Sequence, residues 1–148
     1  MQKKAVRIVL VVAAVVVLVQ FIPVERVNLP VGVEVPAPPE VRAVLRRACY
    51  DCHSNESVWP WYSRVAPVSW LVARDVREGR AEVNYSTWDV YSSADQLKKL
   101  AKSRKEVDKG KMPLWFYLPI HPNARLSAQD VALLDSWAGP LPPPTPKP

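Results

Sequence analysis

Both cysteines and one of the two histidines of this 148-residue chain lie within five consecutive residues, C-Y-D-C-H at 49–53. Three side chains that bind metals or form thioethers are therefore concentrated at one point of the chain. A fold that contains this cluster must leave its side chains accessible to the group that they bind. The nature of that group is the first question that the sequence raises.

The pattern C-x-x-C-H is the attachment motif of c-type haem. Two thiols add across the two vinyl groups of haem, and two intervening residues let both thiols reach the vinyls from one turn. The histidine that follows is thereby placed beneath the iron as an axial ligand. The motif predicts one covalent haem c, attached through Cys49 and Cys52, with its iron bound by His53.

Three alternatives to haem attachment are open for this cluster. A redox disulfide between Cys49 and Cys52 needs no histidine, and the βαβ pattern expected around it is absent. A zinc site could combine Cys49, Cys52, His53 and His121, although two adjacent residues would both have to turn onto one small ion. Chance occurrence of the motif is the third alternative.

Met112 is the only methionine besides Met1, and it lies in the stretch G-K-M-P at residues 110–113. A thioether on a loop that follows a glycine can approach the second face of a haem. We predict Met112 as the distal iron ligand. His121, in a proline-flanked loop, is the alternative distal ligand, and filling the core is the alternative role for a lone methionine.

An apolar run covers residues 5–22 and is interrupted only by Arg7 and Gln20. Its 18 residues reach the lower end of the ~17–25 that span a bilayer. No small-residue cleavage site follows the run, so we expect residues 1–22 to be an uncleaved transmembrane signal-anchor rather than a signal peptide or a core helix. The basic residues before it predict a single-pass protein of a bacterial inner membrane, with the rest in the periplasm.

The remaining chain divides into a proline-rich linker over residues 23–39, a domain over 40–139 and a proline-rich tail over 140–148. Repeated prolines predict that the linker is an extended tether. Hydrophobic periodicity predicts an all-α domain. Its four helices are expected at 40–48, at 68–78 with Gly79 as the stop, at 93–110 with Ser93 and Gln96 as cap, and at 127–139 with Ser127 and Asp130.

The formal net charge is +6, but three of the 20 basic residues precede the exported part, which contains all 14 acidic residues. The exported part therefore has a net charge of only +3, which is too mild to indicate nucleic-acid binding. A basic cluster leads up to Met112. We expect it either to be a solvated helix face or to steer an acidic redox partner protein. Its members are Lys98, Lys99, Lys102, Arg104, Lys105, Lys109 and Lys111.

The order of helix, C-x-x-C-H, helix, G-x-M-P and C-terminal helix resembles a class I cytochrome c. More closely, residues 40–139 resemble the bacterial haem-binding domain family. The residues that carry this resemblance are Cys49, Asp51, Cys52, His53, Ser54, Pro60, Trp61, Tyr62, Ser63, Ala66, Pro67, Trp70, Gly110, Met112, Pro113, Tyr117, His121, Pro122, Ala124, Leu126, Ser127 and Trp137. The resemblance implies a small cytochrome c-like helical domain around one haem.

Iron held by histidine and methionine has no open position, which suits one-electron transfer. We therefore expect an electron carrier that is not an enzyme and has no small-molecule substrate. A haem sensor or peroxidase-like protein with a displaceable Met112 is the alternative, and a non-haem membrane-anchored module is a third. We also expect a backbone carbonyl of Pro60 or Pro67 to accept from His53, and Arg64, with Trp59 or Trp61, to contact the haem propionates.

Overall fold

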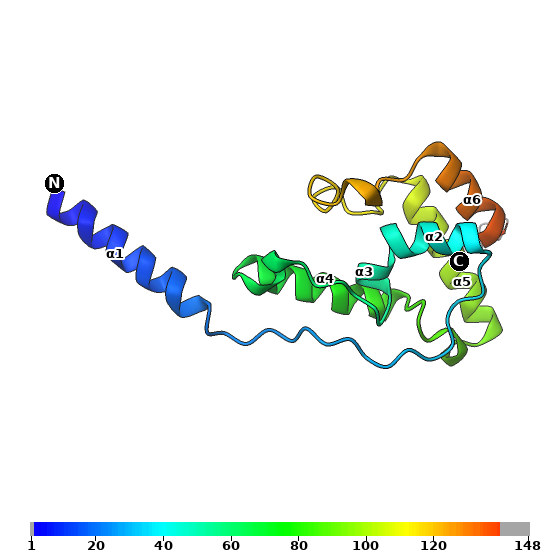
Figure 1. Cartoon of the computed structure of the whole chain (residues 1–148), viewed down its shortest axis with the longest axis horizontal. Coiled ribbons are helices and arrows are strands. Elements are labelled where there is room, and N and C mark those ends of the chain that lie inside the picture. Colours follow the sequence, from blue (N-terminus) through cyan, green and yellow to red (C-terminus); the bar gives the residue numbers. More distant parts are fainter. Residues whose placement is uncertain (1, 140–148) are drawn as a thin grey trace, which may run out of the picture.

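The structure is a computed structural model and describes residues 2–139 (Figure 1). No β-strand occurs within these residues, so the prediction of an all-α fold is confirmed. The predicted tail over residues 140–148 lies outside the described part. The elements are α1 (Gln2–Val19), α2 (Pro39–Ala48), α3 (Tyr50–His53), η1 (Trp61–Arg64), α4 (Val68–Glu82), η2 (Trp88–Val90), α5 (Ser93–Asp108), η3 (Pro122–Ala124) and α6 (Ala128–Ala138), where η marks a 3₁₀ turn.

Side-chain caps start the last two long helices. The predicted capping box of α6 is confirmed, since Ser127 accepts from the backbone N–H of Asp130 and the Asp130 carboxylate accepts in return. Gly139 follows the helix with φ of 74°, a conformation that favours glycine. Helix α5 is capped by Ser92, which accepts from the backbone N–H of Asp95, one residue before the predicted pair. The prediction was wrong by one residue because two successive serines both satisfy the pattern.

The hydrophobic core lies between α2, α6 and the loop that follows α4. Helix α2 presents three apolar residues at helical spacing to this core, and Leu134 of α6 packs against them. Two stacked tyrosines, Tyr50 and Tyr85, bring the core up to the cysteine motif, with 6.0 Å between their ring centroids. The buried members are Val35, Val41, Val44, Leu45, Tyr50, Val83, Tyr85, Trp88 and Leu134.

The segment expected to be a free tether is extended, but its second half is bound along the domain. Val35 is only 1% exposed, and its N–H donates to the Tyr85 carbonyl at 2.8 Å. The N–H of Gly32 donates to Ser86, and the Val33 carbonyl accepts from Trp88 at 2.7 Å. These bonds fix the segment in place, so it does not give the domain a free reach.

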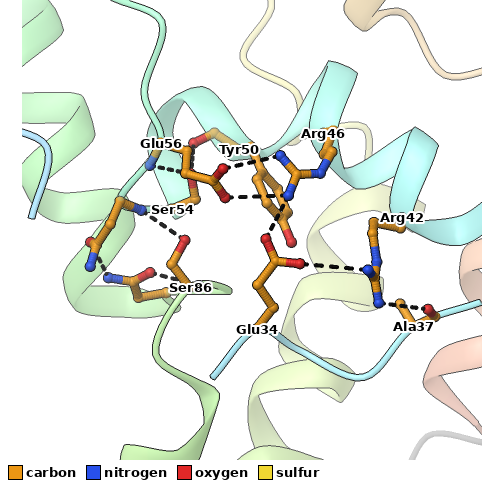
Figure 2. A network of polar contacts seen from close by, with 10 residues as sticks. Glu34, Ala37, Arg42, Arg46, Tyr50, Ser54, Glu56 and Ser86 are labelled. Carbon is orange, nitrogen blue, oxygen red and sulfur yellow. Dashed lines mark hydrogen bonds and ion pairs between the residues drawn. The ribbon is translucent and has the colours of Figure 1, made fainter. Parts of the chain in front are cut away.

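Glu34 in the same segment joins it to α2 through charged groups (Figure 2). Its carboxylate lies 2.5 Å from a guanidinium nitrogen of Arg46 and 3.7 Å from one of Arg42. Arg46 also donates to Glu56 at 3.2 Å. Because the arginines are half exposed, each pair is worth little by itself. The network joins the segment to α2, and the buried side chain of Val35 adds an apolar contact with the core.

Helix α1 projects away from the other helices in Figure 1, and none of its side chains is buried. At its end, the Gln20 side chain exchanges two hydrogen bonds with the backbone of Ala66. No helix within residues 2–139 combines the length and the apolar character needed to cross a membrane. The predicted transmembrane helix over residues 1–22 is therefore corrected: the helix ends at Val19, and Lys3, Lys4 and Arg7 occupy its first turns.

The docking of this segment can be tested by truncating two of its valines. Val35→Ala should lower the free energy of unfolding by about 1–3 kcal/mol, because it leaves a cavity in the core. Val33, which is 56% exposed, is the matched control, and Val33→Ala should change stability by less than about 0.5 kcal/mol. Urea denaturation measures both values. Equal effects would show that the segment is detached in solution.

Candidate functional site

The cysteine motif begins where α2 ends and forms the short helix α3. The Cys49 carbonyl accepts from the backbone N–H groups of Cys52 at 3.2 Å and His53 at 2.9 Å. This single turn brings the three side chains of the motif together. Both thiols are free and partly buried, so the disulfide considered from the sequence is not present.

A cavity of about 470 Å³ opens beside the motif and brings all four predicted ligand residues together. Cys49, Cys52 and His53 line it from the motif, and Met112 lines it from the loop after α5. The other walls come from α4, α5 and the segment after Met112. They include Gly79, Glu82, Val83, Tyr85, Lys99, Lys102, Val107, Pro113, Leu114, Phe116, Tyr117 and Leu126.

The His53 ring is held by backbone carbonyls at the end of α4. Its Nδ1 lies 2.9 Å from the Gly79 oxygen and 3.2 Å from the Val83 oxygen. A carbonyl can only accept, so Nδ1 carries the proton and Nε2 keeps a lone pair that can bind a metal. Burial lowers the pKa of His53, which also favours the neutral ring. The partner is a backbone carbonyl as expected, but Pro60 and Pro67 were the wrong residues.

Gly79 has a different role from the helix stop that was predicted. Helix α4 continues through it to Glu82. A Cβ at this position would lie 2.5 Å from the backbone oxygen of Cys52. The missing side chain thus lets α4 contact the backbone of α3 directly. This approach is what carries the Gly79 carbonyl to the ring of His53.

Burial disfavours the charged form of both thiols. It raises the pKa of Cys49 to about 12 and that of Cys52 to about 12. The neighbouring Cys52 adds to the effect at Cys49, and Asp51 adds to it at Cys52. Zinc binding and thiol–disulfide exchange both use the thiolate. The environment of the pair therefore disfavours the thiolate that exchange requires, whereas a bound zinc ion would itself deprotonate its thiol ligands.

His121 does not line the cavity and is engaged by two tyrosines. Its Nε2 lies 2.5 Å from the Tyr62 hydroxyl, and its ring stacks on Tyr117 with 3.9 Å between centroids. The set of ligands considered for zinc is therefore not assembled. Within the described residues, no group of three or more histidine, cysteine, aspartate or glutamate side chains is arranged to hold a metal ion.

The residues predicted for the propionates lie elsewhere. None of Arg64, Trp59 and Trp61 lines the cavity. Trp59 donates to the Asn28 side chain, and Trp61 is 77% exposed. The cations that line the cavity are Arg74, Lys99 and Lys102. The sequence could not identify them, because they come from α4 and α5, whose packing decides which faces meet at the cavity.

Four of the seven residues of the basic cluster have acidic partners, and two of these four pair with carboxylates from other parts of the fold. Lys102 pairs with Glu82, and Arg104 contacts Asp135 at 2.6 Å. Lys98, Arg104 and Lys111 also have acidic neighbours on or next to α5 itself. Lys99 donates to the Glu82 carbonyl and lies over the Tyr91 ring. Steering of an acidic partner by this cluster stays a prediction.

Sequence reasoning gave no role to Arg80, which holds the backbone that follows the motif. Its guanidinium donates to the Ser54 carbonyl at 2.7 Å and to the Ser57 hydroxyl at 2.9 Å. It also donates to Val27 and Asn28 of the N-terminal segment. No local pattern marks such a residue, because its partners are distant in the sequence.

The ligand side chains that meet at the cavity fit one haem c. Sites for cofactors of this kind enclose roughly 300–1,000 Å³ and are mostly apolar with a few placed polar groups. The cavity has this size, and two thiols, an imidazole Nε2 and a thioether reach it from two different elements. Cys49 and Cys52 would hold the haem vinyls, while His53 and Met112 would bind its iron.

Comparison with known proteins supports haem binding. A family model described as a haem-binding domain matches residues 14–139 of the chain. Neither the curated proteins nor the solved structures contain a significant match. The matched range includes all of residues 23–39, the segment whose second half is bound along the domain.

The contact at Gly79 leads to a test in which two effects have opposite signs. Helix propensity alone predicts that Gly79→Ala stabilises the chain by about 1 kcal/mol. The clash with the Cys52 carbonyl predicts a loss of about 1–3 kcal/mol. Arg77→Ala, at an exposed position of the same helix, is the control and should change little. Denaturant unfolding decides between the signs, and a stabilised variant would refute the close contact.

Proposed function

Because the chain belongs to the haem-binding domain family, we propose that it is a c-type cytochrome that transfers single electrons. The protein binds haem, and the proposal concerns how the haem is held and used. The observation that carries it is the meeting of Cys49, Cys52, His53 and Met112 around one cavity. Two thiols at this spacing are suited to covalent attachment, and two axial donors are suited to a low-spin iron.

Each side chain has a separate task in this proposal. The thioethers of Cys49 and Cys52 would retain the haem. His53 would bind the iron through Nε2, because its Nδ1 donates a hydrogen bond to the Gly79 carbonyl. Met112 would bind from the other side, with its backbone N–H anchored on the Glu106 carbonyl at 3.1 Å. The haem iron supplies the one-electron chemistry. The remaining walls would orient the ring.

Two axial protein ligands leave no position for a substrate, which favours electron transfer over catalysis. The physiological reaction would then be exchange of electrons with a redox partner protein rather than turnover of a small molecule. In bacteria c-type haem is attached outside the cytoplasm, so we place the haem domain in the periplasm.

Covalent attachment is tested on the chain matured with haem. Its mass should correspond to the polypeptide plus one haem, and acidified organic solvent should not extract the haem. Cys49→Ser with Cys52→Ser should abolish attachment, because no thiol then remains to add to a vinyl group. Ser136→Ala, which replaces an exposed hydroxyl on α6 outside the cavity lining, is the control. Extraction of haem from the unmodified protein would contradict the proposal.

The distal ligand is tested by comparing two substitutions. In Met112→Ala the weak charge-transfer band of an iron–thioether bond should vanish, and carbon monoxide should bind to the reduced haem. His121→Ala should keep the band, because His121 lies outside the cavity lining. The reverse result would identify His121 as the ligand. Rapid carbon monoxide binding to the unmodified protein would instead favour a haem sensor or a peroxidase-like protein.

A further inference from the structure

The loop that carries Met112 is joined to the rest of the domain by few bonds. Met112 itself is anchored through its backbone at the end of α5. Within residues 113–121, only two hydrogen bonds of the described chain reach a distant element, and both use side chains. Tyr117 donates to Asp51 at 2.6 Å, and His121 pairs with the Tyr62 hydroxyl at 2.5 Å.

Asp51 is one of the two residues between the haem-attaching cysteines. One oxygen of its carboxylate accepts from Tyr117, and the other accepts from the backbone N–H of Val58 at 3.0 Å. Burial and the bond to Asp51 raise the pKa of Tyr117, so its hydroxyl remains the donor. A hydrogen bond to a carboxylate is stronger than one between neutral groups. The motif on one side of the cavity is thus bonded directly to the loop on the other.

The two bonds act as one unit because His121 and Tyr117 stack in parallel. Their ring planes differ by 7°. Each ring therefore limits the motion of the other, and the stack is held at one end by Asp51 and at the other by Tyr62. Tyr117 also lines the cavity, so displacement of the stack would change the wall next to Met112.

We infer that Asp51, Tyr117, His121 and Tyr62 form a clamp that positions Met112 against the iron. The inference rests on the proposed ligation by Met112 and adds the group that maintains it. Without the clamp, no hydrogen bond would join residues 113–121 to a distant element. They would be held only at their ends, by the bonds of Lys111 and Met112 to the Glu106 carbonyl and by the bonds of Arg47 to the carbonyls of Asn123 and Arg125. The thioether would then leave the iron more often, and the site would open to a small ligand.

The test compares single-oxygen deletions in the haem-loaded chain. Tyr117→Phe should raise the equilibrium fraction of haem with a dissociated thioether about tenfold, the expected effect of losing a hydrogen bond to a charged acceptor. Carbon monoxide binding to the reduced protein reports this fraction, since only open iron binds. Tyr62→Phe should act in the same direction and more weakly, because the partner of its hydroxyl is not a carboxylate.

Tyr91→Phe is the matched control. It also deletes one tyrosine oxygen, which accepts from the Asn84 N–H at 3.0 Å, away from the loop. Carbon monoxide binding should be unchanged in this variant even if stability falls. Asp51→Asn keeps an acceptor oxygen, so it should raise carbon monoxide binding less than Asp51→Ala does.

A double variant separates positioning from general weakening of the domain. If Tyr117 acts through Met112, then Met112→Ala with Tyr117→Phe should bind carbon monoxide as Met112→Ala alone does. The clamp is refuted if Tyr117→Phe and Tyr62→Phe behave like Tyr91→Phe while the unmodified protein shows the iron–thioether band. Absence of that band from the unmodified protein would overturn the ligation by Met112 itself, which is a different failure.

Discussion

The direct contact between the backbones of α3 and α4 at Gly79 organises the site. It allows one carbonyl of α4 to accept from His53 Nδ1, and that bond determines which ring nitrogen remains available for iron. The same approach buries the Cys52 thiol against α4. Arg80, one residue further along α4, then holds the chain that leaves the motif. The close approach of α3 and α4 and the orientation of the His53 ring therefore depend on one glycine.

The two sides of the cavity are built differently. On the His53 side, the ring is fixed by one helical turn and by carbonyls at the end of α4, and the His53 carbonyl accepts from the Tyr85 N–H. The Met112 side is a loop that is bonded to the Glu106 carbonyl at its start and to Arg47 at its end, with the proposed clamp between them. Such asymmetry suits a cytochrome in which histidine ligation is permanent and methionine ligation can be tuned. The ligand affinity of the haem would then depend on Tyr117 and Asp51 as well as on Met112.

The features that the sequence predicted are those written in short local patterns. The motif at residues 49–53, the lone Met112 and the cap at Ser127 can each be recognised from a few consecutive residues. The failures mostly required knowledge of which distant segments meet. Gly79 resembled a helix stop because the approach of Cys52 is invisible in the sequence. Val35 resembled part of a free linker because its contact with Tyr85 joins residues 50 positions apart.

The central claim is that His53 and Met112 bind one haem iron from opposite sides while Cys49 and Cys52 attach the haem. A crystal structure of the matured protein tests it most directly. The account predicts iron bonded to His53 Nε2 and Met112 Sδ, thioether bonds from both cysteines, and His121 still paired with Tyr62. Iron bonded to His121, or a haem held without thioether bonds, would contradict it.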